Sequence, residues 1–325
     1  MKYPIKEEYQ DKIKNWFSND SNRMFIISGY AGCGKTTLAR QIPELLGVRN
    51  YRFLAPTGKA SLLLGGGTIH SYLYKVHEDE DGELIFTKKS IDEFDESLLL
   101  IDEISMVGDD ILEDLRELNI PMIGLGDPAQ LPPVKGTNDI LENPDILLTE
   151  VFRMDGGLLK LATDIREGNT RNLIKKEYDD VSFRNNMLND ITDVKDDDVI
   201  IVRYNKTRQE INSYYRRHIK KFENLLDIGE KIMILDNDRF GSGLMNGSIV
   251  HIVDIGYIDK RYHTVTLRVE DDLGRRFNIN ANIRPITKVK GFVPKKTLGI
   301  DYAYAITCHK AQGSEYERVF VIKEG

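Results

Sequence analysis

Short apolar runs alternate with polar loops and helical segments over the first half of the chain. Four runs predict buried strands: Met24–Ser28, Tyr51–Ala55, Leu98–Ile101 and Pro121–Leu125. The segment Thr36–Leu46 predicts a helix that ends at Gly47. Alternating strands and helices are typical of an α/β fold, a parallel sheet with helices on both faces. In such sheets, the loops after the carboxyl ends of the strands form the ligand site.

Two segments break this alternation. Residues 74–87 predict a small hairpin of two strands around an Asp-Gly turn. Residues 230–283 alternate apolar and polar positions and contain turn signals at Asn246-Gly247 and near Gly274. They predict an all-β insertion of four or five strands, after which the α/β style resumes near Tyr302.

Length and composition limit the class of protein. The 325 residues predict two domains, which we place at residues 1–150 and 151–325. No stretch approaches the ~18–20 apolar residues of a membrane span, so no membrane partner is expected. The two cysteines, Cys33 and Cys308, exclude a disulfide scaffold and a cysteine-rich zinc module. A reducing, cytoplasmic setting is therefore expected.

The net charge of −7 hides an uneven distribution along the chain. Residues 201–325 hold 22 Lys and Arg against 15 Asp and Glu, whereas the rest holds 23 against 37. A polyanion would therefore be attracted to the C-terminal part. A solvated charged surface explains the same split.

A glycine-rich stretch follows the first predicted strand and opens the predicted helix. Residues 29–36 read GYAGCGKT, the complete GxxxxGKT phosphate loop. In such a loop the backbone N–H groups surround a polyphosphate, and Lys35 would reach the β- and γ-phosphates. The Thr36 hydroxyl would bind Mg²⁺. The strand before and the helix after argue against a chance glycine-rich turn.

Acidic and amide side chains follow two further strands. Asp102 would hold Mg²⁺, through water or Thr36, and Glu103 would polarise the water that attacks the γ-phosphate. Gln130 lies in the stretch GLGDPAQLPP, where an uncharged amide can sense the γ-phosphate. The alternatives are a helix cap for the acidic pair and a proline-stiffened surface loop for Gln130.

Seven motifs in a fixed order make the chain similar to the superfamily 1B DNA helicases of the RecD-like and Dda-like kind. They are GYAGCGKT (29–36), APTGKAS (55–61), TIH (68–70), DEISM (102–106), GLGDPAQLPP (124–133), LTEVFR (148–153) and YAITCHKAQGSE (304–315). The resemblance spans residues 10–321. It implies two RecA-like lobes with ATP between them and 5′→3′ movement along single-stranded DNA, coupled to the separation of duplex.

The resemblance also assigns roles to single residues. Gln10 matches an adenine-reading glutamine, Arg153 an arginine presented to the γ-phosphate, and Glu315 a position near the nucleotide. The alternatives are an exposed helix residue for Gln10 and a surface ion pair for Arg153. The expected catalytic residues are Lys35, Glu103, Gln130 and Arg153. The expected nucleotide-binding residues are Gln10, Gly29, Tyr30, Ala31, Gly32, Cys33, Gly34, Lys35, Thr36, Thr37 and Glu315, with Thr36 and Asp102 at Mg²⁺.

The same resemblance predicts a path for single-stranded DNA. In the first lobe it runs over Pro56, Thr57, Lys59, Thr68 and His70, and in the second over Thr307, His309 and Lys310. Hydroxyls, amides and a lysine suit phosphates, which position a strand without reading its sequence. Both histidines have the alternative role of satisfied core residues.

For other residues, the sequence gives weaker support for a contact with DNA. Tyr72, Tyr74 or Phe86 could stack on bases, although most aromatic residues are core. The basic segment 203–221 could face phosphates, and a solvated helix face explains it equally well.

The two irregular segments match insertions of the same family. The hairpin at 74–87 lies where Dda-like helicases insert a pin, and we expect it to split duplex with Phe86 as its stacking residue. Residues 230–283 match the SH3-like barrel of RecD-like helicases and are expected to hold DNA.

The family normally ends with a further motif that carries a second arginine toward ATP. After Glu315 only Arg318 and Lys323 remain as cations, so we expect a missing C-terminal segment, cut away or encoded separately.

Other expected partners are single-strand/duplex junctions and proteins of replication or recombination. Alternative functions are a catalytically weak DNA-binding subunit of a larger helicase complex, and another phosphate-loop hydrolase or kinase. The stretch at Asn205-Lys206 lacks the aspartate of a guanine-reading motif.

Overall fold

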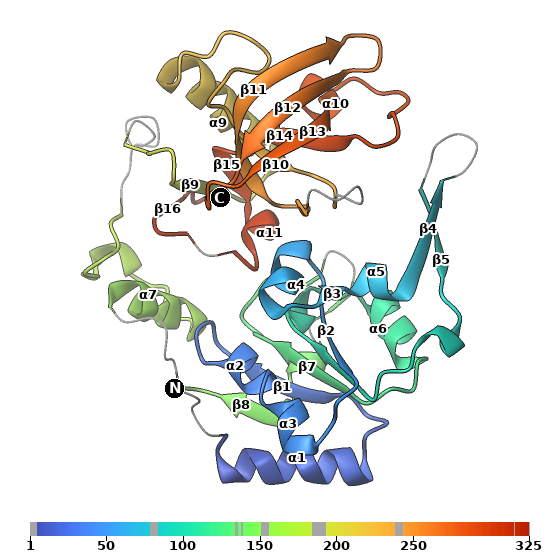
Figure 1. The fold of residues 1–325 in the computed structure, drawn as a ribbon. Helices are drawn as coiled ribbons and strands as arrows, with labels where there is room; N and C mark the ends of the chain where they lie inside the picture. Colours follow the sequence, from blue (N-terminus) through green and yellow to red (C-terminus); the bar gives the residue numbers. More distant parts are fainter. Residues whose placement is uncertain are drawn as a thin grey trace. The chain divides into compact units, whose positions relative to one another are not determined.

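The computed structural model divides the chain into two compact units (Figure 1). It describes residues 5–78, 84–133, 136–137, 139–150, 156–183, 193–237, 243–314 and 316–324. Unit 1 comprises Met1–Lys75 and Thr87–Arg184, and unit 2 comprises Val76–Phe86 and Asn185–Gly325. The division falls after Arg184 instead of after Glu150 as predicted, because the helix that ends at Arg166 packs onto the phosphate loop of unit 1.

Unit 1 is built on a six-stranded sheet with the strand order β3-β2-β6-β7-β1-β8. The strands are β1 (Phe25–Gly29), β2 (Tyr51–Ala55), β3 (Gly67–Thr68), β6 (Leu98–Ile101), β7 (Met122–Gly126) and β8 (Ile146–Leu148). All neighbouring strands are parallel. The four predicted strands are therefore confirmed, and β6, β7 and β1 lie side by side with their carboxyl ends at one edge.

Helices cover both faces of this sheet. They are α1 (Glu7–Asn19), α2 (Lys35–Ala39), α3 (Ile42–Leu46), α4 (Gly58–Leu64), α5 (Ile69–Leu73), α6 (Asp109–Arg116) and α7 (Gly157–Arg166). Alternate residues of β6 enter different cores: Leu98 and Leu100 pack with Trp16 of α1, whereas Leu99 and Ile101 pack with Leu115 of α6. Two hydrophobic cores on opposite faces of one sheet confirm the predicted α/β class.

The prediction of a single helix over Thr36–Leu46 is wrong in one respect. The structure has two short helices, α2 and α3, separated at Arg40 and Gln41. Pro43 lies in the first turn of α3. Proline lacks a backbone N–H and is accepted at a helix start, so it favours a new helix over a continued one.

The predicted hairpin is confirmed as the strands β4 (Tyr74–Glu78) and β5 (Leu84–Lys88), which form a two-stranded sheet. The predicted Asp-Gly turn lies outside the described residues. Ion pairs fix the hairpin's base to α6, because Lys88 Nζ lies 2.6 Å from Asp114 Oδ1 and 2.5 Å from Glu117 Oε2. The Tyr74 hydroxyl donates to Asp114 as well.

Unit 2 contains a smaller parallel sheet with the order β15-β9-β16. Its strands are β9 (Val199–Val202), β15 (Ala305–Thr307) and β16 (Val319–Val321). Helix α9 (Asn205–Tyr214) follows β9 and continues as one π-helical turn, η5 (Tyr215–Ile219), and α11 (Cys308–Ala311) follows β15. The parallel sheet agrees with the predicted second lobe.

A closed five-stranded barrel interrupts this sheet between β9 and β15. It consists of β10 (Lys231–Ile234), β11 (Ile249–Asp259), β12 (Thr264–Glu270), β13 (Arg276–Asn282) and β14 (Leu298–Tyr302), with α10 (Arg284–Thr287) before the last strand. The predicted all-β insertion is thus confirmed, but its end at residue 283 is wrong. β14 pairs with β10 and β13 and closes the barrel, because an open sheet would leave unpaired edges.

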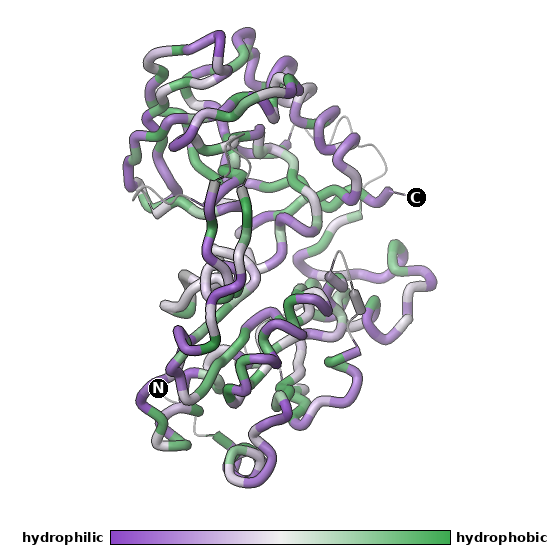
Figure 2. Tube along the Cα trace, turned by 90° about the vertical axis from the view of Figure 1, so that its right-hand side faces the viewer, coloured by the Kyte–Doolittle hydropathy of each residue, from purple (hydrophilic) through white to green (hydrophobic). Residues whose placement is uncertain are grey.

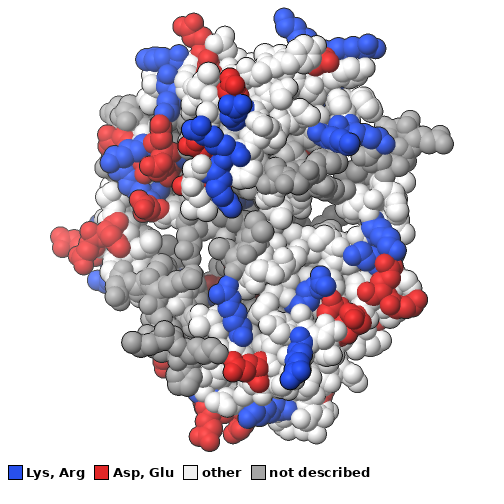
Figure 3. Space-filling model, in the orientation of Figure 1, with Lys and Arg blue, Asp and Glu red and all other residues white. Residues whose placement is uncertain are grey.

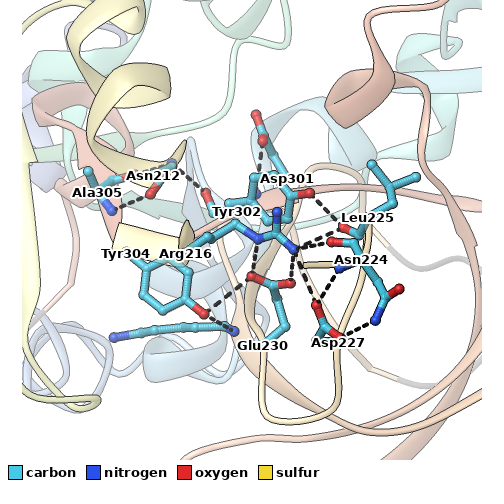
Figure 4. A network of polar contacts seen from close by, with 11 residues as sticks. Asn212, Arg216, Asn224, Leu225, Asp227, Glu230, Asp301, Tyr302, Tyr304 and Ala305 are labelled. Atoms are coloured by element: carbon cyan, nitrogen blue, oxygen red, sulfur yellow. Dashed lines mark hydrogen bonds and ion pairs between the residues drawn. The ribbon is translucent and has the colours of Figure 1, made fainter. Parts of the chain in front are cut away.

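A buried polar network joins η5 to Glu230, the residue directly before the first strand of the barrel (Figure 4). Arg216 donates from Nε to Glu230 Oε1 at 2.5 Å and from a terminal nitrogen to Oε2 at 2.7 Å. Its guanidinium also lies 4.1 Å from the ring centre of Tyr302 on β14. Nearby, the buried Asn212 side chain donates to the carbonyls of Tyr302 and Ala305. The barrel is therefore held to the sheet of unit 2 by specific polar contacts as well as by packing.

Hydrophobic and hydrophilic stretches alternate along the trace (Figure 2). Within the described part of the chain, no helix has the length and apolar character needed to cross a bilayer. On the face drawn in Figure 3, cationic and anionic side chains lie interspersed over the surface. The uneven charge of the sequence therefore does not give this face a single sign.

Candidate nucleotide and nucleic-acid sites

The phosphate loop has the backbone that its glycines permit. Gly32 and Gly34 have φ angles of 77° and 85°, in the region that favours glycine. A Cβ on Gly29 would lie 2.6 Å from Cys33 Sγ and 2.8 Å from the Leu148 carbonyl oxygen, so the loop also needs glycine at its start. Helix α2 begins directly afterwards at Lys35. The loop is thus a tight turn between β1 and α2, as the sequence predicted.

The Lys35 side chain folds back onto its own loop. Its ammonium donates to the carbonyl oxygens of Gly29 at 2.7 Å and Tyr30 at 3.0 Å. An ammonium has three N–H donors, so one is left for a phosphate oxygen. This places the positive charge of Lys35 at the mouth of the loop.

Thr36 and Asp102 meet at the carboxyl edge of the sheet. The Thr36 hydroxyl donates to Asp102 Oδ2 at 3.0 Å, and the backbone N–H of Glu103 donates to Asp102 Oδ1 at 2.9 Å. A hydroxyl and a carboxylate beside a phosphate loop fit Mg²⁺, which takes few protein ligands and fills its sphere with water and phosphate. Among the described residues there is no cluster of three His, Cys, Asp or Glu side chains for a metal. The donor set therefore suits a metal that arrives with the nucleotide.

Glu103 stands next to this pair in an unusual environment. Its backbone has a positive φ of 53°, and its Oε2 atom is buried without a hydrogen-bond partner among the described residues. Burial, and then the charge of Asp102, raise the pKa of the Glu103 carboxyl above its ordinary value. An orphaned, desolvated carboxylate oxygen is what a general base for water requires.

Gln130 is connected to Glu103 by a side-chain hydrogen bond. Ser105 supports Gln130 from behind, because its hydroxyl donates to Gln130 Oε1 at 2.8 Å. The buried Asp127 shapes the turn before Gln130 by accepting from the backbone N–H of Ala129 at 2.9 Å. The structure thus brings together Lys35, Thr36, Asp102, Glu103 and Gln130, which the sequence placed in one site.

The other predicted nucleotide-binding residues have mixed outcomes. Ala31 and Thr37 are exposed, whereas Cys33 is buried and its pKa is raised by that burial. Gln10 lies on α1, and its amide donates to the Ile5 carbonyl at 2.8 Å. Arg153 and Glu315 lie outside the described residues.

In unit 1 the predicted DNA residues occupy one edge. Ala55 of β2 pairs with Thr68 of β3, so the turn with Pro56 and Thr57 lies beside Thr68. The hydroxyls of Thr57 and Thr68 accept from backbone N–H groups at the starts of α4 and α5. His70 is exposed on α5, which excludes the core-histidine alternative there. Lys59 lies on α4, and its side chain lies outside the described part.

In unit 2 the predicted residues surround α11. Thr307 ends β15 and is buried, whereas His309 and Lys310 are exposed. The Lys310 ammonium donates to Asn246 Oδ1 at 2.7 Å. The core-histidine alternative is thus wrong for His309 too.

The weaker candidates separate clearly. Tyr72 is 6% exposed and donates its hydroxyl to Glu96 Oε2 at 2.7 Å, so it is a core residue and cannot stack on a base. Phe86 is 51% exposed and free to do so. In the segment 203–221, Arg208 pairs with Asp301, Arg216 with Glu230 and Lys220 with Asp196. Those three cations form ion pairs with carboxylates of the same chain.

Sequence reasoning missed three residues around the loop. Ser105 and Asp127 lie within two of the identified motifs, but the sequence assigned roles only to neighbouring residues. Arg166 lies on α7, where its guanidinium carbon is 3.7 Å from the ring centre of Tyr30. No local pattern marks Arg166, since its partner lies far away in the sequence.

A phosphate loop after β1, a Thr–Asp pair for a metal and a buried glutamate define a nucleoside-triphosphate-binding α/β protein. Comparison with known proteins narrows this class. A family model described as an AAA domain matches residues 7–184, and one described as a UvrD-like helicase C-terminal domain matches residues 302–324. The chain therefore belongs to the AAA-domain family, and within it to the superfamily 1B DNA helicases.

Two curated relatives are alike over most of the chain. One is the ATP-dependent DNA helicase Pif1 of Bdellovibrio bacteriovorus, 26% identical over 90% of this chain and 77% of its own length. The other is the ATP-dependent DNA helicase dda of Enterobacteria phage T4, 28% identical over 71% of this chain and 63% of its own length.

A solved structure shares the fold. The Pif1 helicase from Bacteroides, in complex with ADP-AlF3 and single-stranded DNA, aligns with a TM-score of 0.64 at 22% identity. The alignment covers 99% of this chain and 88% of the other.

Proposed function

We propose that this chain is an ATP-dependent DNA helicase that hydrolyses ATP to move 5′→3′ along single-stranded DNA and separate duplex. Its relatives are named as ATP-dependent DNA helicases. The observation that carries the proposal is the hydrogen bond between Thr36 and Asp102, which joins a complete phosphate loop to the buried carboxylate next to Glu103. The direction rests on the resemblance to superfamily 1B.

The residues of unit 1 divide the work of hydrolysis. Lys35 neutralises charge on the terminal phosphates, while Thr36 and Asp102 hold Mg²⁺, which polarises the phosphoryl oxygens when bound. Glu103 accepts a proton from the attacking water, and its buried, unpartnered Oε2 is the atom available for this. Gln130 orients that carboxylate and senses the γ-phosphate.

Two sets of residues are proposed to contact the DNA backbone. Thr57, Thr68 and His70 serve in unit 1, and Thr307, His309 and Lys310 serve in unit 2. Hydroxyls, backbone amides at helix starts and a lysine recognise phosphates and ignore base identity, as a translocating motor requires. The strand would thus be held without regard to its sequence.

The two inserted elements are proposed to act on the duplex. The β4–β5 hairpin is anchored to α6 through Asp114 and carries the exposed Phe86, features that suit a wedge. The closed barrel of β10–β14 is a rigid platform for holding the strand. Neither element supplies a residue to the phosphate loop.

ATP hydrolysis with and without single-stranded DNA tests the proposal. We expect slow basal turnover that rises on addition of an unstructured oligonucleotide, and no such rise in Lys35→Ala. A nucleotide kinase or another phosphate-loop hydrolase would hydrolyse or transfer phosphate without responding to DNA. A DNA-binding subunit without catalysis would bind the oligonucleotide and leave ATP intact.

A further inference from the structure

Helix α7 presents an arginine to the phosphate loop. The guanidinium carbon of Arg166 lies 3.7 Å from the ring centre of Tyr30, which is van der Waals contact with the ring face. Among the described residues, this is the shortest distance between a cation and an aromatic ring. Tyr30 is the second residue of the loop, so the stack fixes a positive charge directly beside it.

This guanidinium lacks an anionic partner in the part of the chain that the structure describes. Its Nε is buried and makes no hydrogen bond there, and no ion pair there involves Arg166. By contrast, the cation Lys176 has an anionic partner, Asp164 of α7. A partly buried charge without a partner is costly, so the arrangement suits an anion that arrives from outside the chain.

The position of Tyr30 indicates which anion this is. Its carbonyl oxygen accepts from Lys35 Nζ at 3.0 Å, so Tyr30 lies at the ammonium end of the Lys35 side chain. In phosphate loops that ammonium reaches the β- and γ-phosphates. Tyr30 therefore lies at the end of the loop where the terminal phosphates bind, and Arg166 is stacked on its ring.

We propose that Arg166 is a further nucleotide-binding residue, which donates hydrogen bonds to the terminal phosphate of the nucleoside triphosphate while Tyr30 supports it as a platform. This rests on the proposed function, because it takes the phosphate loop as an ATP site. It assigns to α7 a sensor of the triphosphate that none of the sequence motifs contains.

The test compares the affinities of a non-hydrolysable ATP analogue and of ADP, each with Mg²⁺. Arg166→Met keeps the aliphatic part of the side chain and removes the charged guanidinium. We expect it to weaken binding of the analogue ~10–100-fold, which corresponds to the loss of a hydrogen bond to a charged group. Binding of ADP should weaken by much less. Tyr30→Ala, which removes the platform, should shift the two affinities in the same selective way.

Lys160→Met is the matched control. Lys160 lies on the same helix, but its ammonium lies over the ring of Tyr178, 5.9 Å from the ring centre, and not over Tyr30. We expect parental affinities for both nucleotides. If Arg166→Met unfolds the chain, Arg166→Gln decides, since it keeps a planar polar end group without charge.

Equal affinities of the parent and the Arg166 variants for the ATP analogue would overturn the proposal. Equal losses for the analogue and ADP would do so as well, because Arg166 would then only maintain the shape of the loop. A parent that binds neither nucleotide would refute the proposed function itself, and this inference with it.

Discussion

The Thr36 hydroxyl donates a hydrogen bond to Asp102 Oδ2 over 3.0 Å, although the two residues are 66 positions apart in the sequence. The order β6-β7-β1 brings them together, because all three strands are parallel and end at one edge of the sheet. The phosphate loop, the metal ligands and Glu103 are thereby gathered without any contribution from the barrel. The chemistry of hydrolysis can therefore be altered without changing the barrel.

Substitutions of Lys35 and Glu103 should differ in kind. Lys35→Ala removes a phosphate contact, so both ATP affinity and turnover should fall. Glu103→Gln keeps the size of the side chain but removes the base, so ATP should still bind while turnover falls by ~10²–10⁴-fold. Nucleotide titration and steady-state hydrolysis separate the two effects. Parental turnover in Glu103→Gln would show that the base is elsewhere.

The buried carboxyl of Glu103 should also make hydrolysis depend on pH. Its pKa is raised by burial and by Asp102, and a base must be deprotonated to act. Turnover should therefore increase as the pH rises through a value above the ordinary range of glutamate. The pH profile of turnover at saturating ATP measures this. A flat profile from mildly acidic to neutral pH would contradict it.

The same raised pKa makes stability change with pH in the opposite direction to turnover. The folded state favours protonated Glu103, so this contribution is present at low pH and is lost as the pH rises through the raised pKa. Measured against Glu103→Gln, which cannot titrate, the parent should lose free energy of unfolding toward neutral pH. Chemical denaturation at several pH values tests this, and a difference that stays constant with pH would oppose it.

The buried pair of Arg216 and Glu230 should dominate the stability of unit 2. Glu230→Ala removes the closer of the two carboxylates that pair with the buried Arg216 and leaves Asp227 at 3.8 Å, so the loss should approach the ~3–5 kcal/mol typical of a broken buried pair. The double variant Arg216→Met/Glu230→Leu should recover most of that loss. The exposed Glu223→Ala serves as the control and should change little.

Two probes make this prediction specific to one unit. The single tryptophan, Trp16, is buried in the core of unit 1, so its fluorescence reports on that unit. Circular dichroism reports on the whole chain. Glu230→Ala should lower the overall transition and leave the Trp16 transition near that of the parent, and equal shifts in both would count against it.

The hairpin of β4 and β5 should be needed for strand separation and dispensable for hydrolysis. Replacing residues 76–86 by a short glycine linker keeps Tyr74 and Lys88, which hold the base to Asp114. We expect DNA-stimulated hydrolysis to persist and unwinding to be lost, with Phe86→Ala as the milder variant. Equal loss of both activities would exclude a wedge.

Local patterns in the sequence were sufficient to predict the phosphate loop, four strands of the first sheet and the two inserted β elements. In each of these elements the signal is contained in a few consecutive residues. Pairings between distant residues could not be predicted, because Gln130 meets Ser105 and Arg166 meets Tyr30 only after the sheet has formed. The barrel's end was misplaced for the same reason, since β14 is separated from β13 by α10 and belongs to the barrel through its pairing with β10.

The most direct test of the account is strand separation on two duplexes that differ only in having a 5′ or a 3′ single-stranded tail. With ATP and Mg²⁺, the account predicts separation of the 5′-tailed duplex, little of the 3′-tailed one, and none by Lys35→Ala. Separation of the 3′-tailed duplex alone would contradict the direction. Separation of neither duplex, at concentrations where the chain binds both tails, would contradict the proposal that it is a helicase.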